Sequence, residues 1–464
     1  MQENIYAVMR KYVYLAVAVT VIYFFQSFFL PAGGIGADSL SYFGIASDLP
    51  AIETNLFPLG FPVLIKIFHT LFQDYFWAAK MLNIFIVIFV LLFSYFKKFY
   101  FRETVLLFTG KTVFFAMNLV ISEGPFIFLL YFLIYFFHER LQEKIDSRSF
   151  IFSASIILIL LFTVRYSGIY IYLGVGILWM LMVFKKVTFP AQMDFLWVLM
   201  ISGLGIGAYL GFNHAVFGSF TGEHLRGAPA QIYPVYLLRN VFAIANVIDP
   251  FIGIKPASNG FLSISFQAGL MIFDLVLLRY FITLFREKKR FLQLEFHYLL
   301  WIIAGVYTVT LFISGLFQQI EELNVRMLAA ANFFLFFSFF VIYFKNLKSD
   351  VLIFRLGSFF LAFLTVYSLK SPENYLQNKR IIEPQMSKFQ GKKYLFDDEK
   401  SIIYITEYHI PVLKKSFSYQ HTNSQKGEWK QSIAGSINPQ IKWLKYDTIN
   451  DKKQVLYTSE LFLK

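Results

Sequence analysis

Four charged residues stand at the ends of long apolar runs, where they contribute little to solubility. Asp38 follows the first run in a glycine-rich loop, Glu123 separates two runs, Arg165 ends a run and Arg326 begins one. A carboxylate can take a proton from a reacting hydroxyl, and a guanidinium binds an anion such as phosphate. Together the four residues are typical of a pocket for an anionic, partly apolar substrate.

Hydroxyl groups accompany these charges, and we expect Ser39, Tyr42 and Tyr166 to add hydrogen bonds to a bound molecule. Two further acids in the first loop, Asp48 and Glu53, are interpreted as solvated charges. The lone histidine of the long middle loop has no second histidine at metal-binding spacing. The pattern therefore predicts no metal site.

Each of the four charges also has a purely structural interpretation, which the sequence leaves open. Asp38 would cap a helix that starts one residue later. Glu123 would favour a helix start through the helix dipole. Arg165 would extend its guanidinium toward the interface or pair with Glu123, and Arg326 would pair with Glu322. The occurrence of all four at one predicted depth favours a shared site.

The composition excludes most classes of protein. The chain has 464 residues, of which 57% are hydrophobic, 20% aromatic and only 15% charged. Soluble domains carry about 25% charged residues, so soluble enzymes, disordered chains and fibrous proteins are excluded. The absence of cysteine excludes disulfides and thiolate chemistry. The net charge of +13 is attributed to the loops of a membrane protein rather than to nucleic-acid binding.

The apolar residues form runs that approach the length of about 20 residues needed to cross a bilayer. Because only a helix satisfies its own backbone there, each run is predicted to be a helix. We expect an all-α multi-pass membrane protein of about eleven spans, over residues 12–30, 76–96, 105–121, 125–138, 150–165, 168–184, 195–217, 262–285, 297–318, 327–344 and 351–369. A further apolar stretch, 57–73, is interrupted by two prolines and a glycine and is predicted to lie at the membrane surface or to insert in part.

Lysine and arginine orient the chain, because they accumulate in cytoplasmic loops. If the N-terminus is cytoplasmic and 57–73 does not cross, six basic gaps fall on one side. They contain Arg10, Lys11, Lys97, Lys98, Arg102, Arg140, Lys144, Arg148, Lys185, Lys186, the cluster 286–290, Lys345, Lys348 and Arg355. Asp38, Glu123, Arg165 and Arg326 then face the opposite side.

The chain divides into two parts by composition. Residues 1–370 form the predicted membrane domain, with outward loops over 31–75 and 218–261. Residues 371–464 are polar and lysine-rich, and we expect a small extracytoplasmic domain with β structure there, from strand-like stretches at 393–396, 402–408 and 454–457.

The residues around the four charges resemble the GT-C superfamily of glycosyltransferases, which use polyprenyl-phosphate sugars as donors. The nearest branches are the protein O-mannosyltransferases, the aminoarabinose transferases and their bacterial relatives. The resemblance covers roughly 10–370 and rests on five stretches, namely 36–42, 55–62, Ser122-Glu123, 165–168 and 324–328.

The resemblance implies inverting transfer of a hexose or pentose to a lipid, glycan or protein acceptor, outside a bacterial cytoplasmic membrane. Asp38 would be the general base, Arg165 and Arg326 would stabilise the leaving phosphate, and Glu123 would hold the acceptor or an arginine. The chain lacks the adjacent Asp-Glu pair that some relatives carry at the first-loop acid. A divalent cation is therefore not indicated, and no cofactor besides the lipid-linked donor is implied.

Two other functions stay open. A lipid-linked glycan ligase or polymerase also uses outward arginines, although its large loop typically comes late in the chain. A transporter or flippase needs polar residues at mid-membrane depth. Asp274 and Arg279 are the main residues of that kind here.

Overall fold

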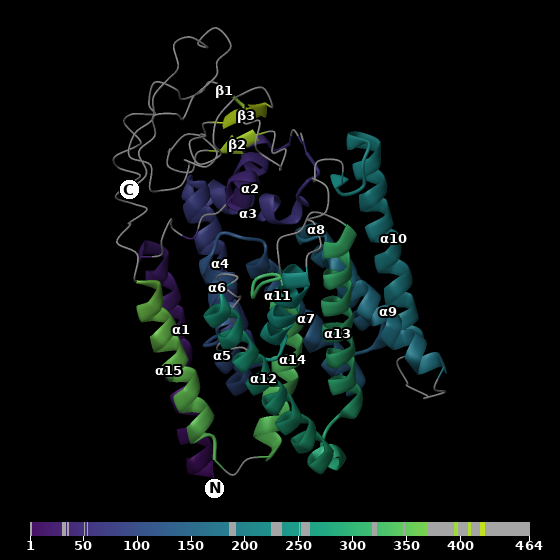
Figure 1. Cartoon of the computed structure of the whole chain (residues 1–464). Coiled ribbons are helices and arrows are strands. Elements are labelled where there is room, and N and C mark those ends of the chain that lie inside the picture. The colour runs from purple at the N-terminus through teal and green to yellow at the C-terminus, as the bar shows by residue number, and fades with distance from the viewer. Residues whose placement is uncertain are drawn as a thin grey trace.

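The computed structural model is a bundle of roughly parallel and antiparallel helices (Figure 1). It describes residues 2–29, 34, 37–50, 52, 54–184, 192–223, 234–249, 251, 260–317, 323–346, 349–369 and three short segments of the tail. The helices are α1 (Gln2–Phe29), α2 (Ala37–Asp48), α3 (Gly60–Phe72), α4 (Tyr75–Phe96), α5 (Phe101–Leu107), α6 (Lys111–Asn118), α7 (Glu123–Leu141), α8 (Ser147–Val164), α9 (Gly168–Phe184), α10 (Gln192–Phe217), α11 (Pro234–Ile244), η3 (Ala245–Val247), α12 (Phe261–Lys288), η4 (Lys289–Phe291), α13 (Leu294–Phe317), α14 (Ala329–Asn346) and α15 (Val351–Ser368).

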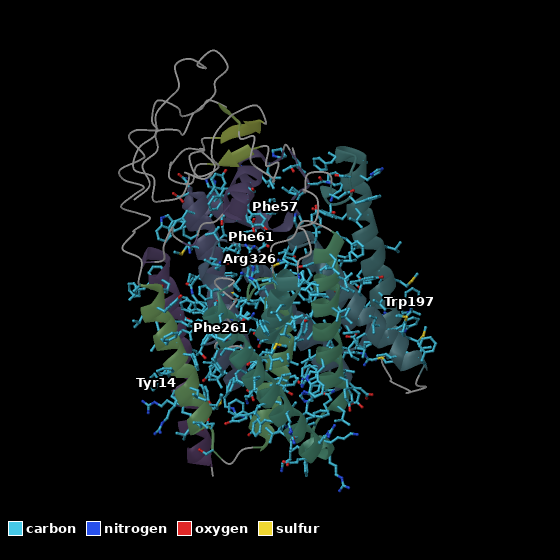
Figure 2. The ribbon with its side chains drawn as sticks, viewed as in Figure 1. Tyr14, Phe57, Phe61, Trp197, Phe261 and Arg326 are labelled. Atoms are coloured by element: carbon cyan, nitrogen blue, oxygen red, sulfur yellow. The ribbon has the colours of Figure 1, made fainter. Side chains whose placement is uncertain are left out.

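The long helices indicate a multi-pass membrane protein. In the part of the chain that the structure describes, seven helices are long and apolar enough to cross a bilayer: 75–96, 123–141, 147–164, 192–217, 261–291, 294–317 and 351–368. Three more apolar helices are shorter, at 60–72, 168–184 and 329–345. The outer surface is apolar, and Tyr14, Trp197 and Phe261 lie exposed on its flanks (Figure 2). Such a surface suits lipid rather than water.

One predicted span is wrong as a single helix. The run 105–121 is divided between α5, which ends at Leu107, and α6, which begins at Lys111. Gly110 caps α6 with extended backbone (ψ 154°), because glycine is a poor helix former and interrupts the apolar run. Both short helices pack against α4. Each of the other predicted runs falls largely within one helix, and the total of eleven spans stays a prediction.

Most of the stretch 57–73 folds as the short apolar helix α3, which spans Gly60–Phe72. Phe61 and Ile65 are buried on one face, whereas Ile67 and Leu71 are exposed on the other. α3 packs against α2, α4 and the end of α8. Figure 1 shows α2 and α3 together at one end of the bundle.

Several basic residues of the predicted cytoplasmic gaps lie at the other end of the bundle, as far as the structure describes them. Contacts between helix ends establish this: Lys11 with Asp350, Arg102 over the ring of Phe344, Arg140 with Asp194, and Gln142 with Gln293. The N-terminus lies at the same end (Figure 1). The structure thus places the described basic residues of the predicted cytoplasmic gaps far from α2 and α3.

Three short strands are present in the tail, β1 (Tyr394–Asp397), β2 (Glu407–His409) and β3 (Ser418–Thr422). They form a sheet of order β1-β3-β2, in which β3 is parallel to β1 and antiparallel to β2. These strands cover a small part of 371–464. A tail domain with those boundaries stays a prediction, and the strand-like stretch 454–457 lies outside the described residues.

Candidate functional site

The four predicted charges meet at the end of the bundle that carries α2 and α3. Asp38 lies in the first turn of α2, and Glu123 is the first residue of α7. Arg165 is the C-cap of α8, and Arg326 lies in the turn before α14 (labelled in Figure 2). Because α7 and α8 pack as neighbours, the start of α7 adjoins the end of α8.

A chain of ion pairs joins these four residues. Nη1 of Arg326 is 2.9 Å from Oδ2 of Asp38, and Nε of Arg326 is 3.4 Å from Oε1 of Glu123. Nη1 of Arg165 also contacts Oε1 of Glu123. Glu123 therefore lies between two guanidinium groups, and Arg326 lies between two carboxylates. Two positive and two negative charges balance, which lowers the cost of placing them beside apolar side chains.

The four side chains differ in their exposure to solvent. The side chain of Glu123 is 5% exposed, that of Arg165 20%, that of Arg326 26% and that of Asp38 35%. Glu123 is thus an internal carboxylate that fixes the two arginines. Asp38 is the carboxylate that a molecule approaching from outside can reach, and Arg326 is the cation beside it.

The structural alternatives have different outcomes. Arg165 does pair with Glu123, as its structural interpretation predicts. The expectation that Asp38 caps a helix starting one residue later is wrong, because α2 begins at Ala37 and Asp38 is inside its first turn. Arg326 pairs with Asp38 and Glu123. Its predicted partner, Glu322, lies outside the described residues.

Arg165 is a fixed positive charge. Burial lowers the pKa of its guanidinium, but the charge of Glu123 and the neighbouring Tyr307 and Tyr42 outweigh burial and raise that pKa above its usual range. Its Nε also lies 3.2 Å from the Oγ of Ser167, to which it donates. Arg165 is therefore largely satisfied by the protein itself.

Tyr42 and Ser39 hold α2 against the turn that precedes α7. The hydroxyl of Tyr42 donates to Oγ of Ser122 at 3.0 Å, and its ring packs edge-on against two phenylalanines, among them Phe61. Oγ of Ser39 donates to the carbonyl of Val120 at 2.5 Å. Both side chains are buried. The geometry supports a role for them in positioning Asp38.

Tyr166 belongs to a separate polar group beside the ion pairs. Its hydroxyl donates to the carbonyl of Asn55 at 2.6 Å and accepts from Nδ2 of Asn213 at 3.2 Å. Nδ2 of Asn55 donates to the carbonyl of Ser219 at 2.7 Å. This group fastens the loop after α10 to the segment before α3 that contains Asn55. Sequence reasoning did not single out Asn55, Asn213 or Ser219 individually, although an asparagine at the end of an apolar helix is a signal for such a bond.

Tyr307 of α13 is a further residue of the site that sequence reasoning missed. Its hydroxyl lies 3.1 Å from Oγ of Ser167 and 3.3 Å from the carbonyl of Met327. Tyr307 thus ties the segment of Arg165 to the segment of Arg326. Nothing in a chain with 28 tyrosines distinguishes this one by sequence.

The other residues named from the sequence are not assigned to the site. Asp48 is the last residue of α2, whereas Glu53 and the middle-loop residue His224 lie outside the described residues. Among the residues that the structure describes, no three histidine or carboxylate side chains are grouped as metal ligands.

We compared the chain with protein-family models, curated proteins and solved structures, and none of the three comparisons finds a match.

Proposed function

We propose that the protein is a glycosyltransferase that moves a sugar from a polyprenyl-phosphate donor to an acceptor outside the cytoplasmic membrane. The observation that carries this proposal is the contact of Asp38 with Arg326. A partly exposed carboxylate and a partly exposed guanidinium lie 2.9 Å apart at one end of an apolar bundle. Such a pair supplies a base for a hydroxyl and a cation for a phosphate at adjacent positions.

In this proposal Asp38 accepts the proton of the acceptor hydroxyl while the acceptor oxygen attacks the anomeric carbon. The bond between that carbon and the phosphate oxygen breaks, and the lipid phosphate leaves with the electron pair. Attack opposite the leaving group inverts the anomeric centre. Arg326 compensates the negative charge that develops on the phosphate oxygen.

The two arginines receive different roles. Arg165 is held by Glu123 and Ser167, so it maintains the geometry of the site. Arg326 is more exposed and adjoins Asp38, so we assign the contact with phosphate to Arg326. Glu123 holds both arginines rather than the acceptor.

The test is transfer of radiolabelled sugar from polyprenyl-phosphate donors to a membrane lipid or glycan extract, with purified protein in lipid nanodiscs. Asp38→Asn keeps the shape of the side chain and removes the base, so we expect transfer to fall about 100-fold or more. Asp74→Asn is the matched control, because Asp74 caps the nearby helix α4 and asparagine caps equally well. Undiminished transfer by Asp38→Asn would remove Asp38 from the mechanism.

The arrangement in the membrane belongs to the same proposal. We propose eleven spans, a cytoplasmic N-terminus, and an extracytoplasmic tail domain over 371–464 in a bacterial cytoplasmic membrane. This arrangement is supported by the position of Lys11, Arg102 and Arg140 at the end of the bundle opposite α2 and α3. The chain has no cysteine, so a single cysteine at position 38 can be labelled without background. Labelling from the cytoplasmic side alone would reverse the orientation.

A second candidate function, transport of a lipid-linked substrate, is favoured by one observation. Asp274 lies in the middle of α12 and is 3% exposed. Its Oδ1 has no hydrogen-bond partner in the described part of the chain. Carboxylates at membrane depth are commonly functional. If transport is the function, Asp274→Asn abolishes activity in sealed vesicles while Asp38→Asn has little effect, and the glycosyltransferase proposal expects the reverse.

A further inference from the structure

The turn between α6 and α7 carries Glu123 at its end, and side chains from other helices hold its backbone. α6 stops at Asn118, because Leu119 is extended (ψ 154°). The last carbonyls of a helix have no partner within the helix. Here Nδ2 of Asn83 donates to the carbonyls of Met117 and Leu119, at 2.9 and 3.1 Å.

Lys80 lies one helical turn before Asn83 on α4 and binds the carbonyl between those of Met117 and Leu119. Its Nζ donates to the carbonyl of Asn118. Lys80 is 1% exposed, and within the described residues no carboxylate pairs with it. A buried ammonium without a counter-ion is costly. The partial negative charge at the end of α6 offsets that cost, because a helix dipole favours a cation at its C-terminus.

The same turn is bonded to the loop that leads to Asp38. The N–H of Val120 donates to the carbonyl of Gly34 at 2.9 Å. The carbonyl of Val120 accepts from Ser39, the residue that follows Asp38. Four consecutive carbonyls, from 117 to 120, are therefore bound by side chains from α4 and α2. Any shift of this turn moves Glu123 and the start of α2 together.

We propose that Lys80 is a positioning residue of the candidate site: it fixes the 117–122 turn and thereby sets both Glu123 and Asp38 relative to the arginines. The claim about the turn stands on its own geometry. Its consequence for catalysis rests on the proposed function. Arginine at position 80 can still donate to the carbonyl and keep the charge, whereas methionine fills the space without donating.

The accessibility of the turn tests this directly. Val120 is fully buried, and Val120→Cys gives the chain a single thiol without changing the backbone bonds. We expect slow maleimide labelling in this parent, labelling about ten-fold faster or more when Lys80→Met is added, and the parent rate with Lys80→Arg. Lys97→Met, an exposed lysine at the other end, should leave the rate unchanged.

A second thiol position separates local from general loosening. Val175 of α9 is fully buried, so Val175→Cys reports on the whole fold. If Lys80→Met raises labelling equally at 175 and 120, or at neither position in a folded protein, the proposal is wrong. Should Lys80→Met not accumulate, Lys80→Gln carries the same comparison, because glutamine lacks both the charge and the reach.

Transfer activity distinguishes this inference from the proposed function. Where transfer is measurable, Lys80→Met should lower kcat about ten-fold or more with little change in KM for the donor. Lys80→Arg should keep the kcat of the wild type. Faster labelling at 120 with unchanged kcat would uphold the contact of Lys80 with the turn but overturn its role as a positioning residue of the site.

Discussion

Nη1 of Arg326 lies 2.9 Å from Oδ2 of Asp38, although 288 positions separate the two residues in the chain. The same guanidinium reaches Glu123 through its Nε. Because a guanidinium has several donors in a fixed plane, one arginine can bridge two carboxylates that come from different helices. This bridge joins residues of α2, α7 and the turn before α14 into a single site at the end of the bundle that carries α2 and α3.

Replacing that bridge with a point charge should impair the site without unfolding it. Arg326→Lys keeps the positive charge but cannot contact both carboxylates with the same geometry. We expect kcat/KM for sugar transfer to fall about 10- to 100-fold, with a small change in melting temperature. Arg355→Lys, an exposed arginine at the other end, is the control. Equal activity of both variants would contradict a role for the bridge.

Glu123 is expected to be more important for stability than any other member of the site. Glu123→Gln leaves Arg165 and Arg326 without their shared carboxylate, and an uncompensated buried charge costs about 3–5 kcal/mol. The melting temperature in detergent should fall accordingly. The double variant Glu123→Gln with Arg165→Met should recover most of the loss, because it removes the unpaired charge as well. Additive losses would show that the pair does not interact as the structure indicates.

The loop after α10 should depend on Gly222 for its position. Gly222 has φ +67°, and a Cβ there would lie 2.8 Å from Cα of Leu56. Gly218 has φ +70° but open space around it, so Gly218→Ala is a matched control that costs only about 1–2 kcal/mol of backbone strain. We expect Gly222→Ala to be clearly less stable than Gly218→Ala and to speed proteolysis of this loop. Similar stabilities would mean that the loop is not docked on Leu56.

At the opposite end, the pair Lys11–Asp350 should make stability depend on acid pH. Burial raises the pKa of Asp350, but hydrogen bonding from Lys11 and its charge outweigh burial and hold that pKa below its usual value. Nζ of Lys11 is 2.5 Å from Oδ1 of Asp350. Because the folded pKa lies below the unfolded value of about 3.9, the pair stabilises the fold above that pH. The stabilisation is lost as the pH falls through the folded pKa.

Asp350→Asn should therefore lower stability at pH 7 by about 1 kcal/mol or less, because both groups are partly open to solvent. In Asp350→Asn the melting temperature should also fall less between about pH 5 and about pH 3 than it does in the wild type. Glu143→Gln is the control, because Glu143 is exposed and pairs with no cation in the part of the chain that the structure describes. An unchanged acid profile in Asp350→Asn would remove this pair as its cause.

Periodicity and length predicted most helices, because a run of apolar residues in a membrane has only one way to satisfy its backbone. The exception, 105–121, shows the limit of that reasoning. The run stays apolar through Gly110, but the helix is interrupted there. Gly110 has extended backbone and forms the N-cap of α6. The prolines and the glycine in 57–73 predicted a stretch that does not cross the bilayer. The stretch contains the short apolar helix α3, and its position in the membrane stays a prediction.

The sequence by itself determined the membrane class of the protein, because long apolar runs suit a bilayer. It also singled out the four charges at the ends of those runs, although it left a structural interpretation open for each of them. Only the tertiary structure decided the environment of each charge: Glu123 is buried, Arg165 pairs with it, and Asp38 and Arg326 are the more exposed pair. Packing also places Lys80 and Tyr307 beside the site, where each donates a hydrogen bond to a backbone carbonyl of a distant segment. A sequence pattern gives the type and spacing of side chains along one helix. The hydrogen-bond partner of a side chain depends on which other segment packs next to it in the fold.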